Sequence, residues 1–423
     1  MSKIFSWASI EATSAPGKLA RKEVEQWTQN TQTRVVLYRD RFGWCPYCHK
    51  VWLWLEEKGV DYSVRKVSMF CYGQKEAWYT AKFPRGMLPA LELDGALLTE
   101  SDSILVALES AFGSNIHPVS DTESPRDKHE YTLDSTTLQP LRRLERRFFS
   151  AWCAWLCRPQ DSSNSAKLGF LNCLRDIDNA LSATPGPYFL ASFSVMDIIF
   201  APFLERAHAS IYYYKGVDIY SPTLNFPYLY AWQVAMTSRK SVGSIRADFH
   251  THVHDLPPQL GGCFPSGDQV QQECARKVDK GPWITLPDFV DYTNWQELRV
   301  EALYRVWKHR EAIKFVNPDK ATDRFDIALR CTLTNMMNAP YLLYSFGAAG
   351  NETLIKPPEG SAIGIRHLRN QICVPRDMSI GAANLLRQAL EATAALDGDA
   401  EPLALPTSHR RDQDATPFSS PNL

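Results

Sequence analysis

The sequence predicts an α/β domain, followed by an all-α domain and an additional helical module on the carboxy-terminal side. Three observations predict this fold class. The chain has 423 residues, more than the roughly 250 to 300 at which a single hydrophobic core stops growing. Strand and helix patterns alternate over residues 34–115, whereas helical periodicity alone continues after residue 138. A stretch with several prolines and glycines, 248–283, precedes a further set of amphipathic segments.

Changes in composition and periodicity divide the chain into six segments. In order they are an amino-terminal extension, the α/β domain, the all-α domain, a linker or long loop, the helical module and a disordered tail. Their boundaries are 1–33, 34–115, 122–247, 248–283, 284–396 and 397–423. The extension contains a predicted short helix, 19–28, and we expect it to pack on the first domain.

The α/β domain begins with a strand at 35–38, a loop, and a helix at 46–58 that ends at Gly59, a residue type common at helix ends. Residues 62–67 alternate as a second strand, so this segment forms a βαβ unit with a right-handed crossover. A helix, a two-stranded hairpin and a second helix follow. These elements cover residues 75–82, 88–93, 97–99 and 102–112. The order βαβ, α, ββα, with a Cys-x-x-Cys after the first strand, is typical of a thioredoxin-like domain.

Large apolar side chains recur at helical spacing in the second domain. They are Leu138, Leu141, Leu144, Phe148, Trp152 and Trp155. Later, Ser194 and Asp197 form a capping box in which Asp replaces the usual Glu, and Phe193 and Ile198 suit a hydrophobic staple. A buried helix is therefore predicted to begin there. The carboxy-terminal module is predicted to contain four helices, at 291–315, 321–337, 362–372 and 379–396.

Composition argues against several classes of protein. A net charge of -1 with 22% charged residues gives no sign of nucleic-acid binding. No run reaches the roughly 18 uncharged apolar residues of a membrane span, since Asp197 interrupts the nearest candidate, 188–203. The first thirty residues do not resemble a secretory signal. Ten cysteines in 423 residues are too few for a disulfide scaffold, and only Cys45 and Cys48 have a redox spacing. We therefore expect a reducing compartment, the cytoplasm or the plastid stroma.

The motif Cys45-Pro46-Tyr47-Cys48 lies at the amino end of the helix predicted at 46–58. Unpaired backbone N–H groups and the positive end of the helix dipole stabilise a thiolate there, and a Cys-x-x-Cys setting lowers a thiol pKa into roughly the 3.5 to 7.5 range. Cys48 follows one turn later, close enough to attack a disulfide at Cys45. A structural zinc site would need a second Cys or His pair at matching spacing, and none is evident. We therefore expect thiol-disulfide chemistry and no metal.

Two further positions suit a ligand. Pro89 follows Leu88 at the start of a strand, and in thioredoxin-like folds the corresponding bond is cis and exposes the preceding backbone. Glu100 and Ser101 open the helix that continues over 102–112. Free N–H groups and hydroxyls at such a helix start can hold a carboxylate while an acidic side chain meets an amine.

These features occur in the order found in the glutathione transferase family, and residues 34–247 resemble that family. A cysteine at the catalytic position is similar to the omega, lambda and dehydroascorbate reductase groups. Residues 44–52, followed by residues 71–73, are most similar to the iota class of photosynthetic organisms. That class also carries extensions at both ends, and residues 374–379 resemble part of its carboxy-terminal module.

The resemblance implies a role for each of these residues. Cys45 is the catalytic thiol. Leu88, ahead of Pro89, offers its backbone to the cysteinyl part of glutathione. Glu100 and Ser101 hold the γ-glutamyl end.

The expected function is that of a glutathione-dependent thiol transferase, in which Cys45 attacks a glutathione mixed disulfide and a second glutathione releases the protein thiol. Glutathione is then the cosubstrate. Arg85 and Lys75 are candidates to bind its glycyl carboxylate. Small-molecule or protein disulfides are the other substrates, and the resemblance also implies a homodimer. Two alternatives stay open: a conjugating glutathione transferase, and a non-catalytic ligand-binding or assembly protein with the same fold that carries a hydrophobic ligand.

The other histidines and cysteines are given no site. His250, His252 and His254 alternate, and we expect them on a solvated strand or loop rather than around a metal. Buried or incidental thiols are expected at Cys71, Cys153, Cys157 and Cys173.

Overall fold

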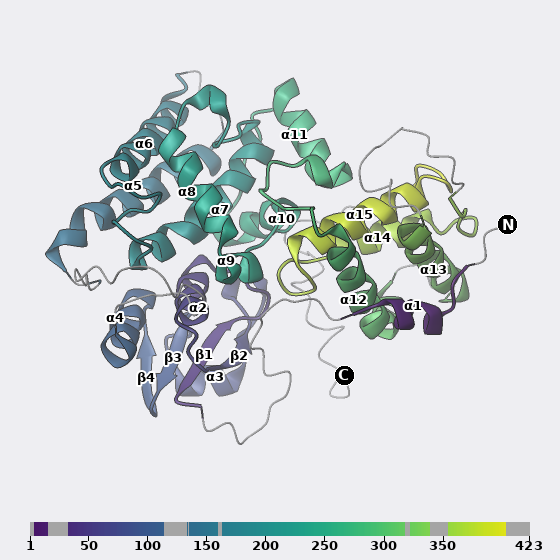
Figure 1. The fold of residues 1–423 in the computed structure, drawn as a ribbon, viewed down its shortest axis with the longest axis horizontal. Helices are drawn as coiled ribbons and strands as arrows, with labels where there is room; N and C mark the ends of the chain where they lie inside the picture. Colours follow the sequence, from purple (N-terminus) through teal and green to yellow (C-terminus); the bar gives the residue numbers. More distant parts are fainter. Residues whose placement is uncertain are drawn as a thin grey trace. The chain divides into compact units, whose positions relative to one another are not determined.

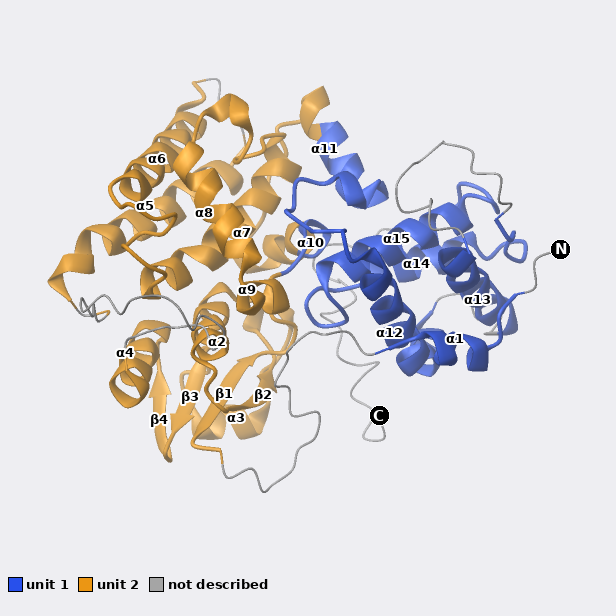
Figure 2. Cartoon of the chain, viewed as in Figure 1, with its two compact units in different colours: residues 1–19, 247–251, 272–423 blue, residues 20–246, 252–271 orange. Residues whose placement is uncertain are grey.

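The computed structural model describes residues 4–15, 33–113, 133, 135–159, 163–317, 322–338 and 354–402. The chain divides into two compact units, which Figure 2 colours separately. Unit 1 comprises residues 1–19, 247–251 and 272–423, and unit 2 comprises residues 20–246 and 252–271. The short helix predicted at 19–28 lies outside the described residues, and so does the tail from residue 403 onward.

Unit 2 begins with a four-stranded sheet in the order β2-β1-β3-β4 (Figure 1). The central β1 (Val35–Asp40) pairs in parallel with β2 (Ser63–Val67) and antiparallel with β3 (Ala90–Leu93). An antiparallel hairpin joins β3 to the edge strand β4 (Ala96–Thr99). The mixed sheet predicted from the sequence is therefore confirmed.

Helices cover both faces of this sheet. They are α2, α3 and α4, at Pro46–Lys58, Ala77–Lys82 and Ser101–Phe112. Successive side chains of a strand point to opposite faces, so Leu37 and Tyr38 are buried by different helices. The ring of Tyr38 lies 5.9 Å from that of Tyr79 in α3, measured between centroids. Leu37 is fully buried on the opposite face, where α2 and α4 pack together and against the strands. The thioredoxin-like arrangement is confirmed.

The rest of unit 2 is helical, as predicted. Helices α5 to α9 span Gln139–Leu156, Ser165–Ser182, Val195–Lys215, Pro227–Ser238 and Lys240–Ile245. The central one, α7, packs against both α5 and α2 (Figure 1). Its first turn carries the predicted capping box: Ser194 Oγ accepts from the Met196 N–H at 3.2 Å, and Asp197 Oδ2 accepts from the Ser194 N–H at 2.9 Å.

The segment 248–283 is not a linker or long loop, and that prediction was wrong. It contains helices α10 and α11, at Phe249–Leu260 and Gln269–Lys280. The prolines indicated a loop because Pro257 has no N–H to donate to the carbonyl of Val253, as a helix requires. In the structure the Tyr214 hydroxyl of α7 donates to that oxygen at 2.7 Å, so the helix tolerates the proline. The histidines of this segment therefore lie on a helix, and His252 is buried rather than solvated.

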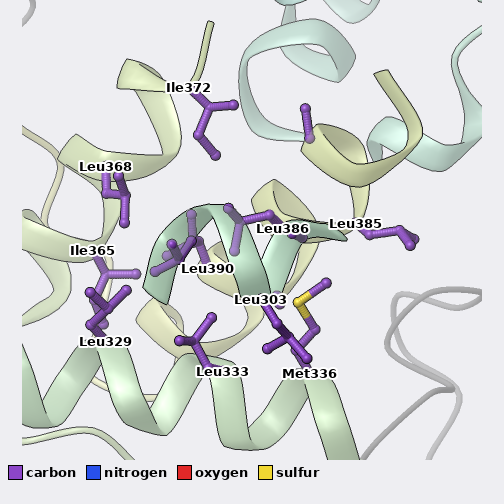
Figure 3. Close-up of a cluster of buried hydrophobic side chains, with 14 of the residues drawn as sticks. Leu303, Leu329, Leu333, Met336, Ile365, Leu368, Ile372, Leu385, Leu386 and Leu390 are labelled. Carbon is purple, nitrogen blue, oxygen red and sulfur yellow. The ribbon is translucent and has the colours of Figure 1, made fainter. Parts of the chain in front are cut away.

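Unit 1 has a hydrophobic core of its own, which Figure 3 shows in close-up. The helices that contribute to this core are α1, α12, α13, α14 and α15, at Trp7–Thr13, Trp295–Val316, Thr322–Asn338, Ala362–Gln371 and Ile380–Ala394. The four helices predicted on the carboxy-terminal side are confirmed. Leu386 and Leu390 of α15 lie with Leu329 and Leu333 of α13 and Leu303 of α12 in one buried cluster (Figure 3). Within the described residues, no helix is long and apolar enough to cross a membrane.

Both ends of the described chain depart from the predictions. The amino-terminal helix α1 belongs to unit 1, whereas the first domain belongs to unit 2; its Ile10 is buried in the core of unit 1, and the Trp7 indole donates to Asp326 Oδ1 at 2.9 Å. These apolar side chains need a core, and α12 supplies the surface that contacts α1. At the other end, residues 397–402 are ordered, because Asp397 Oδ2 accepts from the Ala362 N–H at the start of α14, at 2.9 Å.

We predict that Asp197→Ala destabilises unit 2. The buried carboxylate accepts from four donors. These are the backbone N–H groups of Phe189 and Ser194, the hydroxyl of Ser194 and the indole of Trp232. Leaving them unpaired should lower the free energy of unfolding by about 3 kcal/mol, measured as a shift of the urea midpoint by circular dichroism. The control Asp176→Ala removes a half-exposed pair with Arg147 and should cost less than about 1 kcal/mol. Equal midpoints for the two variants would contradict the prediction.

Candidate active site

The loop between β1 and α2 holds the Cys-x-x-Cys motif. Cys45 is the residue that caps α2, with extended backbone angles (φ −69°, ψ 118°), and Pro46 begins the helix. Asp40, the last residue of β1, accepts the N–H of Trp44 on Oδ2 at 2.7 Å and so closes the loop. Cys48 lies one helical turn beyond Cys45 and is fully buried, whereas Cys45 keeps 7% of its surface exposed. Cys45 is thus the sulfur nearer to solvent.

The two thiols have opposite electrostatic environments. A hydrogen bond from Cys48 lowers the pKa of Cys45 and outweighs burial and the Asp40 carboxylate, which oppose it; the backbone N–H groups of Tyr47 and Cys48 add to the lowering. Burial, and then the bond to Cys45, raise the pKa of Cys48 well above its ordinary value. The thiolate therefore forms at Cys45, and Cys48 keeps its proton and donates it.

The strand register brings the other predicted site residues to the same edge of the sheet. Tyr38, two residues before the end of β1, lies opposite Ala90, and Ala90 lies opposite Thr99. The residues just before Ala90 and just after Thr99 are Leu88-Pro89 and Glu100-Ser101. Both pairs therefore flank the end of β1 that leads into the motif. The structure gathers the six predicted site residues around one edge.

The Leu88-Pro89 bond is cis, as expected for this fold. The Tyr79 hydroxyl of α3 donates to the carbonyl oxygen of Met87 at 2.5 Å and holds the chain ahead of this turn. Lys75 donates to the carbonyl of Ser68 at 2.6 Å, and its ammonium lies close enough to both thiols to interact with them electrostatically. A cation and the cis-proline turn therefore lie beside the motif.

Glu100 has a positive φ of 67° at the position that precedes α4. A non-glycine residue in this region is strained, and such strain concentrates at ligand sites. Its side chain is 64% exposed and lies 3.8 Å from Arg85. Asp102 is otherwise engaged: burial opposes its ionisation, but Lys50 and Arg142 lower its pKa to about 2. Glu100 is therefore the carboxylate of this turn that stays exposed to a ligand amine.

Sequence reasoning missed Arg206, a buried residue of α7 that clamps the loop before Cys45. Its Nη2 and Nε donate to the carbonyl of Trp44 at 2.8 and 3.2 Å, and its Nη1 donates to the carbonyl of Pro202 at 2.9 Å. No motif marks this residue, because the partner lies 162 positions away. Only the packing of α7 on α2 reveals it.

A buried polar network surrounds this arginine. His49 Nδ1 lies 3.3 Å from Arg206 Nη1, and since a guanidinium can only donate, that nitrogen accepts and the imidazole is neutral. Burial is the main cause that lowers the pKa of His49 to about 3. The Glu205 carboxylate bonds to His252 of α10 at 2.7 Å; burial opposes its charge, but His252 and the charge of Arg206 lower its pKa to about 2. Glu205 is thus the counter-charge of Arg206.

The motif has no metal-site geometry. Within the part of the chain that the structure describes, no third His, Cys, Asp or Glu joins Cys45 and Cys48 in a group compact enough to bind an ion.

We predict that Asp40→Asn lowers the pKa of Cys45, because the Asp40 carboxylate is the charged neighbour that raises it. The thiolate absorbance near 240 nm, followed against pH, measures the change; a Cys45→Ser variant provides the baseline. The matched control Asp94→Asn removes an exposed hairpin carboxylate that pairs with Arg34, and should leave the titration unchanged. An Asp40→Asn titration curve displaced to higher pH would contradict this account of the site.

Two parts of the chain match families of known proteins. Residues 44–111 match the family "Glutathione S-transferase, N-terminal domain", and residues 146–245 match "Glutathione S-transferase, C-terminal domain". The chain is 27% identical over 191 residues to glutathione S-transferase L3 of Arabidopsis thaliana, covering 44% of this chain and 72% of the relative. It is 24% identical over 224 residues to the chloroplastic glutathione S-transferase DHAR3 of the same plant, covering 53% and 77%.

Two solved structures are similar to parts of the chain. Glutathione transferase Omega 3C from Trametes versicolor has a TM-score of 0.40 and 23% identity, with 58% of this chain and 98% of that chain covered. The trimeric glutathione transferase TDR1 of Leishmania has a TM-score of 0.44 and 21% identity, with 63% and 57% covered. The two family matches therefore identify residues 44–111 and 146–245 of this chain as the amino- and carboxy-terminal domains of a glutathione S-transferase.

Proposed function

We propose that the protein is a glutathione-dependent thiol transferase with Cys45 as its nucleophile. The Cys45 thiolate attacks the glutathione sulfur of a mixed disulfide, so that a new S–S bond forms at Cys45 and the substrate leaves as a thiolate that takes up a proton. The thiolate of a second glutathione then attacks the glutathione sulfur on Cys45. Glutathione disulfide leaves, and the Cys45 thiolate is restored.

One arrangement carries this proposal: Cys45 caps the amino end of α2 with Cys48 one turn on, which lowers the pKa of Cys45 and raises that of Cys48. A thiolate at Cys45 is both the attacking group and, in the second step, the leaving group, and a lowered pKa speeds departure. Protonated Cys48 stabilises that thiolate by its hydrogen bond. Two thiols with equal pKa values would not provide one thiolate and one protonated donor.

The edge of the sheet beside the motif suits glutathione. The backbone of Leu88 is proposed to pair with the cysteinyl part, and Glu100 with Ser101 to hold the γ-glutamyl end. Lys75 and Arg85 both stay candidates for the glycyl carboxylate. Relatives that match 44% and 53% of this chain are named glutathione S-transferases, which supports glutathione as the cosubstrate.

The expectations about class, oligomeric state, ligand and compartment stay predictions. They are membership of the iota class, a homodimer, a bound hydrophobic ligand, and a reducing compartment, the cytoplasm or the plastid stroma. None of the ten cysteines, all of which lie in described residues, forms a disulfide, which supports the last of these. An assay with an aryl halide beside one with a mixed disulfide separates the proposal from a conjugating transferase. A biological role that survives Cys45→Ser would favour the non-catalytic alternative.

We predict that Cys45→Ser abolishes thiol transfer, because it removes the nucleophile. Cys48→Ser should retain activity within about tenfold of the parent, since glutathione can act as the resolving thiol. A coupled assay of mixed-disulfide reduction measures both, and intact-mass spectrometry should show a glutathione adduct on Cys45 in the Cys48→Ser protein. Equal loss in both variants would point to an obligatory Cys45–Cys48 disulfide, and full activity of Cys45→Ser would refute the proposal.

We also predict that the double variant Glu100→Ala, Ser101→Ala weakens glutathione binding about tenfold or more, because a hydrogen bond to a charged group contributes about 1.5–3 kcal/mol. Isothermal titration calorimetry with reduced glutathione measures the effect. Asp94→Asn, on the same hairpin but at its far end, is the control and should leave the affinity unchanged. Unaltered affinity in the double variant would remove both residues from the proposed site.

A further inference from the structure

Three half-buried cysteines gather in unit 2, away from the motif. Cys153 lies in the last turn of α5, Cys157 caps the end of that helix, and Cys263 lies in the connection between α10 and α11. The thiol of Cys157 lies close enough to both other thiols for each of them to affect its pKa. All ten cysteines are described; six are buried, Cys71 is exposed, and the three of this cluster are half-buried. Three of the four cysteines that are not buried therefore lie at one place.

The backbone arrangement distinguishes between the two contacts of Cys157. The N–H of Phe264 donates to the carbonyl of Leu156 at 2.9 Å. The Leu156 carbonyl is bonded to the nitrogen of Cys157, and the Phe264 N–H follows the carbonyl of Cys263. The backbones of Cys157 and Cys263 therefore lie next to each other. Cys153 and Cys157 instead lie one helical turn apart, where β-carbons are about 5–6 Å from each other. A disulfide needs about 3.8 Å between β-carbons, so the geometry favours the Cys157–Cys263 pair.

The charges around the cluster favour a thiolate at Cys157. The carboxyl end of α5 opposes a negative charge there, because it is the negative end of the helix dipole. Lys215, which is 4% exposed at the end of α7, offsets this: its Nζ donates to the carbonyl of Phe264 at 2.6 Å, and its charge acts on both Cys157 and Cys263. Bonds from Cys153 and Cys263, with the charge of Lys215, outweigh burial and lower the pKa of Cys157 to about 4.

The partner thiol stays protonated. Its bond to Cys157 is the largest cause that raises the pKa of Cys263, followed by burial and by the nearby charges of Cys157 and Asp255. The same bond and burial raise the pKa of Cys153. The surroundings of Cys157 therefore favour its thiolate over the two neighbouring thiols, the arrangement of an oxidisable thiolate beside a resolving thiol.

We propose that Cys157 and Cys263 form a second thiol-disulfide centre, separate from the Cys-x-x-Cys motif, that a hydroperoxide oxidises to a disulfide. The Cys157 thiolate attacks the terminal peroxide oxygen; an S–O bond forms, the O–O bond breaks, and the departing oxygen takes up a proton to leave as water or an alcohol. The Cys263 sulfur then attacks Cys157, an S–S bond forms, and the sulfenic oxygen leaves as water with the proton of Cys263. Two thiols lose two electrons, and one peroxide gains them.

The experiment uses the full chain with Cys45→Ser and Cys48→Ser, so that the motif cannot contribute and failure of the proposed function has no bearing on the result. The protein is treated with about one equivalent of hydrogen peroxide, because one peroxide makes one disulfide. Remaining thiols are alkylated, and the tryptic peptides are mapped. We expect a crosslink between peptides 148–167 and 247–276, which contain Cys157 and Cys263.

Each of these peptides also contains a second cysteine, Cys153 or Cys274. Further variants therefore identify the linked pair: Cys153→Ser and Cys274→Ser should keep the crosslink, and Cys157→Ser and Cys263→Ser should abolish it. Where Cys263→Ser fails to fold, fragmentation of the crosslinked peptide from the parent still names the pair. A Cys153–Cys157 disulfide, or the absence of any crosslink, would overturn the proposal.

A second measurement tests the thiolate directly. At pH 6, limiting iodoacetamide should label Cys157 before Cys71, although Cys71 is the more exposed, because burial raises the pKa of Cys71 to about 11. Preferential labelling of Cys71 would mean that exposure alone controls reactivity, and it would contradict the proposed oxidation route.

Discussion

A buried guanidinium governs the geometry of the candidate active site. Arg206 of α7 holds the carbonyl of Trp44, immediately ahead of Cys45, while Asp40 of β1 holds the N–H of the same residue. The loop is therefore fixed from the sheet and from the helical domain at once. Arginine suits this position because its fork of N–H donors reaches several acceptors and stays charged when buried. The place of Cys45 at the end of α2 depends on this clamp.

The clamp needs a counter-charge, since a buried cation is costly unless it is paired. Glu205 supplies it, and His252 of α10 bonds to Glu205 in turn. The helical domain thus determines the electrostatics around a motif that belongs to the α/β domain. This interdependence explains why the segments expected as two domains, 34–115 and 122–247, form one compact unit in their described parts, whereas the carboxy-terminal helices gather around a separate core.

The two thiol centres of unit 2 reach a thiolate by different means. Cys45 lies at the amino end of a helix, where backbone N–H groups favour negative charge, and one neighbouring thiol completes the stabilisation. Cys157 lies at a carboxyl end, where the dipole opposes negative charge, and it requires two S–H donors and a buried lysine. The first arrangement is encoded by four consecutive residues, whereas the second is assembled from three elements of the fold.

The sequence by itself determined whatever depends on neighbours along the chain. The strand and helix order of the α/β domain, the capping box at Ser194, the four carboxy-terminal helices and the helix-end position of Cys45 all follow from local periodicity and capping, because each residue acts within a few positions of itself. The edge that gathers Leu88 and Glu100 beside the motif was likewise implied by the predicted hairpin.

Only the tertiary structure decided the rest. Helix α10 survives Pro257 because a tyrosine from α7 replaces the missing donor, and α1 belongs to the core of unit 1 because that core buries Ile10. Arg206 meets Trp44, and Cys263 meets Cys157, across long stretches of chain. Contacts between residues so far apart leave no periodic pattern, since side-chain spacing reports which face of an element is buried and not which partner buries it.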